Sequence, residues 1–272
     1  MYDKGWRQMM VLYGAVGIFV AAALWWLLRD SPQQHPRVND AELALIENRS
    51  VAAPAKTRST VGGIPFRQLL ANRSMWLNGL MQFFTNIGWV FLVTATPRYF
   101  ADFHRIPVEE RGWMTSIPTM AAWVGMFLGG ILTDRLVITF GLRWGRTMPI
   151  MLTRMLAASA YLFCLSHPSP WLAVAAFSLA SLACDLGIPA VWAFQQDVGG
   201  KYAGSVLGWG NMFGNLGAAL GPLIFFWAIG ADQNWNRAFL TCSAAFALSG
   251  LAALGIDPTK PVVTEATDET LV

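Results

Sequence analysis

The sequence predicts an all-α, polytopic membrane protein with about seven transmembrane helices. Of its 272 residues, 55% are hydrophobic and only 13% are charged, which is too apolar for an ordinary soluble domain. The apolar residues also fall in blocks that polar or charged stretches separate. Because lipid cannot hydrogen-bond the backbone, we expect these blocks to cross the bilayer as helices, which satisfy their own backbone groups.

Seven blocks are long enough to cross a hydrocarbon core of about 30 Å, which takes about 20 helical residues. Tryptophans lie at or near the ends of several blocks, as expected for amphipathic rings in the headgroup layer. The seven blocks are Met10–Leu28, Leu77–Thr96, Trp113–Thr133, Met148–Ser166, Trp171–Trp192, Gly204–Ile229 and Phe239–Ile256.

The distribution of cations between the loops predicts the orientation. If Met1 lies outside, the inner loops hold twelve lysines and arginines and the outer loops hold six. Cytoplasmic loops carry the excess of positive charge, so we expect an extracytoplasmic N-terminus and a cytoplasmic C-terminus. The first block is too long for a signal-peptide core and has no small-residue cleavage site, so it should remain in the mature protein.

The only long polar stretch, from Arg29 to Arg73, lies between the first two blocks. Within it, the apolar spacing of Asn39–Glu47 predicts a short amphipathic helix that Asn39 or Asp40 caps.

Catalytic, metal and nucleotide sites find no support in the sequence pattern. The three histidines lie in separate loops, and the three cysteines lie in separate apolar blocks without C-x-x-C spacing. The cations are spread over loops and form no basic face with stacking aromatics, as a nucleic-acid site would need. We therefore expect no enzyme activity, no metal, no cofactor and no nucleic-acid partner.

The stretch around Asp134 is typical of a helix that leaves the bilayer on the cytoplasmic side, because apolar residues give way abruptly to charged ones. It resembles the cytoplasmic signature of the major facilitator superfamily, G-x-x-x-D-R followed by basic residues. Val137–Phe140 lengthen the basic tail relative to the family pattern. The resemblance implies a role in conformational change for Gly130, Asp134, Arg135, Arg143 and Arg146. We expect Asp134 either to accept hydrogen bonds from the N-terminus of a neighbouring helix or to pair with Arg135, Arg143 or Arg146.

Segments along the whole chain also resemble one branch of that superfamily, the anion:cation symporter family of hexuronate, galactonate and phthalate permeases. The resemblance implies that the chain holds the sixth helix and the C-terminal half of a twelve-helix transporter, without the N-terminal half. The segments that carry it are Gly5–Arg7, Trp25–Pro32, His35–Val38, Glu42–Ile46, Thr96–Phe100 and Asn211–Gly217.

This resemblance implies a division of the chain into four parts. Residues 1–28 would form the sixth helix, 29–76 the central cytoplasmic loop, 77–256 the six-helix transporter half, and 257–272 a cytoplasmic tail. Because such transporters bind substrate between two halves that rock against each other, half of one cannot gate alone. The chain is expected to be a fragment, a truncated product, or one partner of a separately encoded half.

Two ionisable residues lie inside the apolar blocks, where a charge is costly. Asp185 is near the middle of the fifth block, beside Gly187 and Pro189, which weaken the helix and favour a cavity lining. Asp185 could act directly in transport or could bond a neighbouring helix. Arg154 could extend to the headgroups along its long stem, or could pair with Asp185.

Uncharged polar residues form a third set of candidates. Some share a helix face by their spacing of three or four residues, and their amides could bond a sugar acid or could join helices. Trp192 could stack on a sugar ring or anchor the helix at the interface. The candidates for the substrate or ion pathway besides Asp185 are Gln82, Thr85, Asn86, Trp192, Asn211 and Asn215.

Two functions of different class follow. The first, implied by the resemblance, is secondary transport of a small organic anion such as a sugar acid, coupled to protons or sodium, in a bacterial inner membrane. The second is a seven-helix membrane protein that does not transport, such as a receptor or an assembly subunit.

Overall fold

The computed structural model describes residues 5–29, 32–45 and 66–263. Within these ranges the chain is helical and contains no strand, which confirms the all-α fold class. The internal contacts divide the chain into residues 1–61 and residues 62–272. The two units are described separately below.

The first unit begins with α1 (Gly5–Leu27), an apolar helix of 23 residues that is long enough to cross a membrane. A single turn, η1 (Pro32–Gln34), follows. Residues 40–45 are helical, and the Asn39 side chain accepts a hydrogen bond of 2.8 Å from the Glu42 N–H. Asn39 is therefore the cap of the predicted amphipathic helix, whose last two residues, 46 and 47, lie outside the described part.

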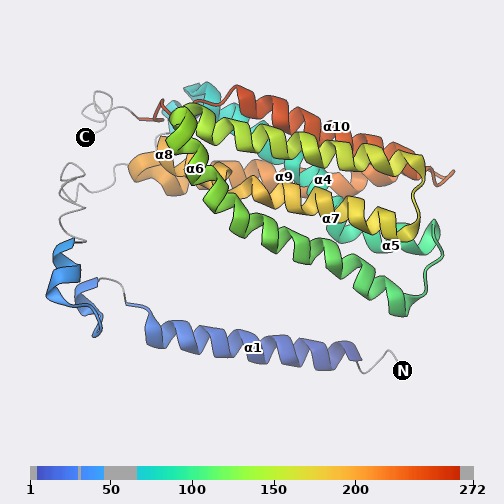
Figure 1. Cartoon of the computed structure of the whole chain (residues 1–272), viewed down its shortest axis with the longest axis horizontal. Helices are drawn as coiled ribbons and strands as arrows, with labels where there is room; N and C mark the ends of the chain where they lie inside the picture. Colours follow the sequence, from blue (N-terminus) through green and yellow to red (C-terminus); the bar gives the residue numbers. More distant parts are fainter. Residues whose placement is uncertain (1–4, 30–31, 46–65, 264–272) are drawn as a thin grey trace. The chain divides into compact units, whose positions relative to one another are not determined.

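The second unit contains the remaining helices (Figure 1). Asparagine side chains accept the first free N–H groups of two of them, Asn72 at α4 and Asn234 at α10. Prolines stand in the first turn of three others, where no N–H is needed. The helices are α3 (Phe66–Ala71), α4 (Arg73–Thr94), α5 (Thr96–Asp102), α6 (Val108–Phe163), α7 (Pro170–Leu186), α8 (Ile188–Gly199), α9 (Ala203–Ile229) and α10 (Trp235–Leu254).

The long helix α6 is a hairpin of two helices that meet at Gly141. This glycine has φ 76° and ψ 172°, a conformation that breaks the helix and that other residues rarely adopt. The chain reverses there so tightly that a side chain on Gly145 would collide with Val137. Figure 1 shows the two arms separating from this turn, with α7 drawn between them. The third and fourth predicted blocks are thus separate helices, as expected, although their polar ends continue in helical form up to the turn.

By length and composition, four helical stretches in the described residues could cross a membrane, or five if the bent pair α4–α5 is one span. Two of these stretches, Val108–Ser166 and Pro170–Ile229, hold 59 and 60 residues and are too long for one crossing of about 20 residues. The first turns back at Gly141, and the second turns back after α8 at η3 (Gly200–Tyr202). Each of the seven predicted blocks therefore lies in a separate helical stretch, and the fifth, Trp171–Trp192, spans α7 and the start of α8.

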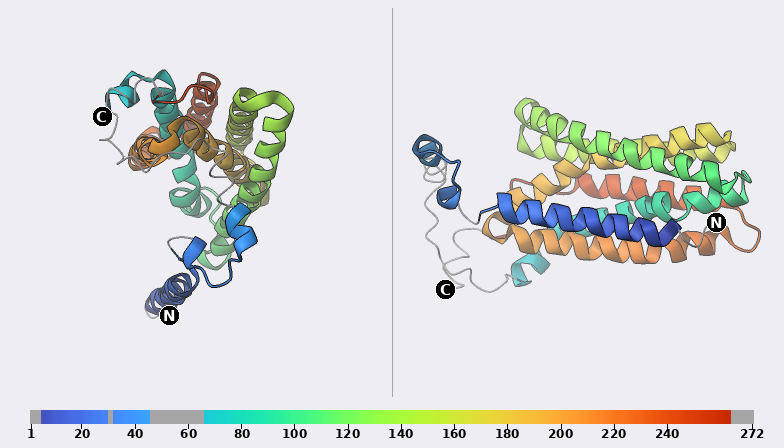
Figure 2. Two further views of the ribbon diagram at one scale, coloured as in Figure 1. Left: turned by 90° about the vertical axis from the view of Figure 1, so that its left-hand side faces the viewer. Right: turned by 90° about the horizontal axis from the view of Figure 1, so that it is seen from below.

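In the second unit, α6 packs most extensively on α7 and α10, and α4 packs on α9 and α10. Figure 2 shows these helices running side by side. Two apolar clusters hold them together. An aromatic cluster includes Phe91, Tyr99, Phe177, Phe225, Trp235 and Phe239. An aliphatic cluster includes Leu69, Met75, Met81, Ile150, Val191 and Phe194, and it also takes in Ile256 and Val262 beyond α10.

Candidate functional site

A buried polar cluster joins four helices of the second unit. Arg154, on the second arm of α6, has no exposed surface. Its Nε donates to Thr85 Oγ1 of α4 at 3.1 Å, and its Nη1 donates to the Cys184 carbonyl of α7 at 2.6 Å. Thr85 Oγ1 lies 2.7 Å from Ser249 Oγ of α10. Because Ser249 gives its single proton to the Met81 carbonyl, Thr85 donates to Ser249.

The structure contradicts both sequence-based interpretations of Arg154. The side chain does not extend to the headgroups, because α4, α7 and α10 enclose its stem and its head. It also forms no ion pair with Asp185, since the described residues contain no carboxylate within 4.0 Å of the guanidinium. The end of α7 supplies a carbonyl instead, which carries partial negative charge and attracts a cation.

The helix that contains Asp185 is broken, as the sequence predicts. Helix α7 ends at Leu186 and α8 begins at Ile188, with Gly187 between them. Pro189 has no N–H, so it cannot continue the helical hydrogen bonding into α7. Asp185 lies partly buried at the end of α7, one residue beyond the carbonyl that Arg154 binds.

A row of amides runs along one face of α4. Asn78, Gln82 and Asn86 follow one another at four-residue spacing, which aligns them on the helix. We call them the amide stripe. Gln195 of α8, almost fully buried, donates from Nε2 to Asn78 Oδ1 at 3.2 Å, and Asn86 Nδ2 donates to the Gln82 carbonyl at 2.9 Å. The Asn78 Nδ2 group is buried and has no hydrogen-bond partner among the described residues.

The amide stripe lies against a glycine face of α9. A side chain on Gly210 would collide with the Gln195 amide, and one on Gly217 would collide with the Phe83 carbonyl. At Gly214 the added carbon would stand 2.9 Å from Asn86 Nδ2. Glycine at these positions therefore lets α9 approach α4 closely, which in turn excludes water from the stripe.

The structure brings together only part of the predicted candidate set. Gln82 and Thr85 are buried in one region of α4, and Asn86 lies partly buried beside them. Asn211 and Asn215 are exposed on the side of α9 that faces away from the amide stripe, and Asn215 Nδ2 donates to the Asn211 carbonyl at 2.9 Å.

Trp192 is also separate from the buried residues, since 47% of its surface on α8 is exposed. Trp192, Asn211 and Asn215 therefore lie exposed, outside the buried polar cluster.

The residues of the proposed conformational signature lie on both sides of the Gly141 turn. Arg146 does not pair with Asp134, as one expectation held, but with Asp197 of α8 at 2.8 Å. Asp134 is exposed and forms no ion pair with a described residue. The four extra residues Val137–Phe140 form another helical turn, so Asp134 lies well before the reversal.

The other three signature residues also occupy exposed or open positions. A side chain added to Gly130 would meet nothing within 4 Å, Arg135 is exposed, and the Arg143 guanidinium lies 5.6 Å from the Trp144 ring centre.

Sequence reasoning missed three polar residues of the buried region: Asn78, Gln195 and Ser249. Asn78 could have been found from the sequence, because it precedes Gln82 by four residues and so continues its face. Ser249 gives no signal in the sequence, because its partner Thr85 is 164 residues away. Only the packing of α10 against α4 brings the two hydroxyls together.

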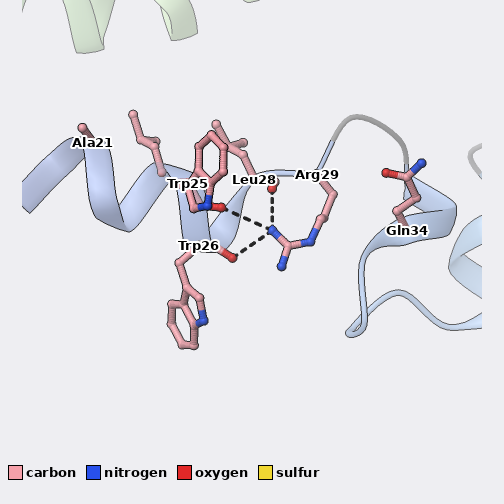
Figure 3. Close-up of a pocket in the computed structure, with 7 residues that line it drawn as sticks. Ala21, Trp25, Trp26, Leu28, Arg29 and Gln34 are labelled. Atoms are coloured by element: carbon pink, nitrogen blue, oxygen red, sulfur yellow. Dashed lines mark hydrogen bonds between the residues drawn. The ribbon is translucent and has the colours of Figure 1, made fainter.

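In the first unit, a hollow lies at the carboxyl end of α1 (Figure 3). The Arg29 guanidinium bends back there, and its Nη1 donates to the carbonyls of Trp26 and Leu28 at 3.1 and 2.7 Å. The cation thus satisfies the free carbonyls at the helix end. Nothing else in this hollow indicates a binding site.

The described residues contain no group of three or more histidine, cysteine, aspartate or glutamate side chains arranged to hold a metal. Cys164, Cys184 and Cys242 are buried free thiols on separate helices or turns. The polar region offers hydroxyl, amide, carbonyl and guanidinium groups, which can hydrogen-bond and orient a ligand.

Comparison with known proteins gives relatives that are named as probable transporters. The chain is 31% identical over 96% of its length to the probable galactarate/D-glucarate transporter GudP of Bacillus subtilis (strain 168). It is 31% identical over 90% of its length to the probable galactarate/D-glucarate transporter GarP of Escherichia coli (strain K12). It is 27% identical over 93% of its length to the probable sulfoacetate transporter SauU of Cupriavidus necator.

The alignments cover 59%, 57% and 58% of these three relatives, so the chain spans less than two thirds of their length. The sequence profile described as Major Facilitator Superfamily matches residues 1–222 and 80–270. Together with the paired apolar helices and the signature around Asp134, this match shows that the chain belongs to the Major Facilitator Superfamily.

Proposed function

We propose that this chain is the C-terminal part of a secondary transporter for a small organic anion, with a sugar diacid as the first candidate. The observation that carries the proposal is the similarity, along nearly the whole chain, to proteins named as probable galactarate/D-glucarate and sulfoacetate transporters. These named substrates share one or two acidic groups on a small, polar body. Exposed amide and indole side chains can hydrogen-bond and stack against such a ligand.

The parts of the transporter follow from this proposal. Residues 77–256 would form the C-terminal half, residues 1–28 the last helix of the other half, and residues 29–76 the loop between them. The N-terminal half is the expected partner. The substrate would bind between the halves, near the middle of the membrane, while the halves rock against each other.

Residues on several helices are proposed for the pathway. The residues that would line the substrate or ion pathway, besides Asp185, are Gln82, Thr85, Asn86, Trp192, Asn211 and Asn215. Asp185 would hold the coupling proton or sodium ion, because a carboxylate is a cation site and not an anion site. Gly130, Asp134, Arg135, Arg143 and Arg146 would act in the conformational change.

Uptake by purified protein in liposomes tests the proposal. The complete polypeptide that carries this sequence should accumulate labelled D-glucarate, galactarate or sulfoacetate under an imposed proton or sodium gradient. Asp185→Asn should reduce the uptake and its dependence on the gradient, since the variant cannot hold a cation by charge. The matched control is Asp232→Asn, whose carboxylate lies 53% exposed in the turn before α10.

Two results would count against the proposal. Equal uptake and equal ion dependence in Asp185→Asn and wild type would leave Asp185 a structural residue. No uptake of any of the three anions by folded protein would favour the alternative, a seven-helix membrane protein that does not transport.

The orientation in a bacterial inner membrane is proposed from the excess of cations in the loops on one side. Thr139→Cys, next to the Gly141 turn, should react with a membrane-impermeant thiol reagent only in inside-out vesicles. Asp232→Cys should react in intact spheroplasts. The native cysteines are buried, so they give little background. The opposite pattern of labelling would reverse the topology.

A further inference from the structure

Arg154 is placed at a point where a helix has lost its own hydrogen bonding. Pro189, in the first turn of α8, has no N–H, so the Asp185 carbonyl lacks the donor that an unbroken helix would supply. The adjacent Cys184 carbonyl accepts from the Gly187 N–H at 3.2 Å and from Arg154 Nη1 at 2.6 Å. The shorter of these two bonds comes from a different helix, and it is charge-assisted.

The second arm of α6 also presses against the break itself. A carbon added to Gly187 would lie 2.5 Å from Thr153 Oγ1 and 3.4 Å from Arg154 Nη1. The end of α7 therefore rests on two consecutive residues of α6. Arg154 thus contacts both the last turn of α7, at the Cys184 carbonyl, and Gly187 at the break.

Two other helices hold the guanidinium in place. Its Nε donates to Thr85, which donates in turn to Ser249 of α10. The head group is thus fixed by α4 and α10 on one side and bound to the end of α7 on the other. Arg154 is a buried cation that forms no direct ion pair with a described residue. Burying such a charge in a membrane protein is costly, which argues for a role beyond packing.

We propose that Arg154 is a positioning residue that holds the break between α7 and α8 at its present bend. The bend determines the position of Trp192 and Gln195 on α8. A role of Arg154 in transport rests on the proposed function, but its role in holding the bend does not. Lysine could supply the charge, but it could not bond Thr85 and the Cys184 carbonyl at once in the fixed geometry of a guanidinium.

Distances between spin labels on the two sides of the break test this proposal. One label pair joins α8 to α10, and the other joins α7 to α10, on exposed residues of the full chain in lipid nanodiscs. The native cysteines are replaced by alanine, which leaves the Cys184 carbonyl in place. The pairs are Gln196→Cys with Leu251→Cys, and Leu179→Cys with Leu251→Cys.

In Arg154→Met, the distance distribution of the α8 pair should broaden or move, while that of the α7 pair stays as in the parent. Arg154→Lys should give a smaller change in the same direction. Thr85→Val removes the bonds of Thr85 to Nε and to Ser249 but leaves the bond of Arg154 to the Cys184 carbonyl, so it should change the α8 pair less than Arg154→Met does. No change in either pair, or an equal change in both, would overturn the proposal in favour of general packing.

If Arg154→Met does not fold, the variant Pro189→Ala tests whether Arg154 or the proline holds the bend. This variant restores the missing N–H, so α7 and α8 could join into one straight helix. If Arg154 holds the bend, the α8 pair should keep its parent distribution in Pro189→Ala. A shift to a straighter arrangement would assign the bend to the proline and overturn the proposal. None of these measurements uses transport, so failure of uptake and failure of the positioning role can be told apart.

Discussion

The two ends of α4 meet their neighbours through different chemistry. From Asn78 to Asn86 the helix presents the amide stripe to the glycine face of α9. Near its other end, α4 enters the aromatic cluster through Phe91, which lies within 6.5 Å, centre to centre, of five other aromatic rings. Even the polar group there, Tyr161, is satisfied, since its hydroxyl donates to the Gly88 carbonyl at 2.9 Å.

This difference indicates which end can move. Interlocked rings are packed at crystal-like density and resist displacement, because any shift opens a cavity. Amides against bare glycine backbone can exchange hydrogen-bond partners with little change in volume. One donor, Asn78 Nδ2, has no partner in the described part of the chain. The break between α7 and α8 and its Arg154 contact lie on the side of the amides. We therefore expect the aromatic end of α4 to contribute most to the stability of the fold, and the amide end to move when the conformation changes.

The largest effect should come from removing the central ring of the aromatic cluster. Phe91→Ala leaves a cavity among rings that cannot close around it, which costs about 3–5 kcal/mol of unfolding free energy. Denaturant unfolding in detergent, followed by circular dichroism, measures this loss. Phe127→Ala, on a side chain that is 80% exposed, is the matched control and should change stability far less. Equal losses of unfolding free energy in the two variants would mean that the aromatic cluster stabilises the fold no more than an exposed ring does.

A smaller effect is expected from adding a methyl group to the close contact of α9 with α4. Gly210→Ala places its carbon against the Gln195 amide and must displace that amide or the helix, at a cost of about 1–3 kcal/mol. Gly208→Ala, on the same helix, meets nothing within 4 Å and should be neutral or slightly stabilising. If both variants unfold at the same denaturant concentration, α9 does not pack against the amide stripe as described.

The ion pair between α6 and α8 should contribute less. Arg146 and Asp197 are 2.8 Å apart with side chains 13% and 26% exposed, so solvent screens part of their attraction. Asp197→Asn should cost about 0.2–1 kcal/mol. Asp102→Asn breaks the more exposed pair with Arg98 at the aromatic end and should cost less still. The two losses, each compared in low and high salt, show whether the amide end depends more on charge than the aromatic end does.

The smallest effect should be a pH dependence at the aromatic end. Burial against Tyr99 and Phe103 lowers the pKa of His104 from its ordinary value of 6.5. The unfolded chain then binds the proton more readily than the folded chain, so His104 favours folding above pH 6.5 and loses that contribution as the pH falls through its lowered pKa. His104→Gln should flatten the stability curve in this range. An unchanged slope would show that another group titrates there.

Much of the fold could be predicted because it depends on local properties of the chain. Apolar blocks of sufficient length specify membrane helices, whatever their neighbours are, since no other structure satisfies a single segment's backbone in lipid. The Asn39 cap and the break at Gly187 and Pro189 were visible for the same reason, because each depends on residues a few positions apart. The alignment of Gln82, Thr85 and Asn86 on one helix face also needs only the helical repeat.

Contacts between distant segments were decided by tertiary structure alone. The sequence by itself established that Arg154 is a charge within an apolar block, but not that the Cys184 carbonyl would take the place of Asp185 as its partner. The partner of Arg146 proved to be Asp197, 51 residues away, and not Asp134. Such choices depend on which helix faces pack together and how closely. A single sequence states which groups need a partner, and only the packed bundle determines which partner lies within reach.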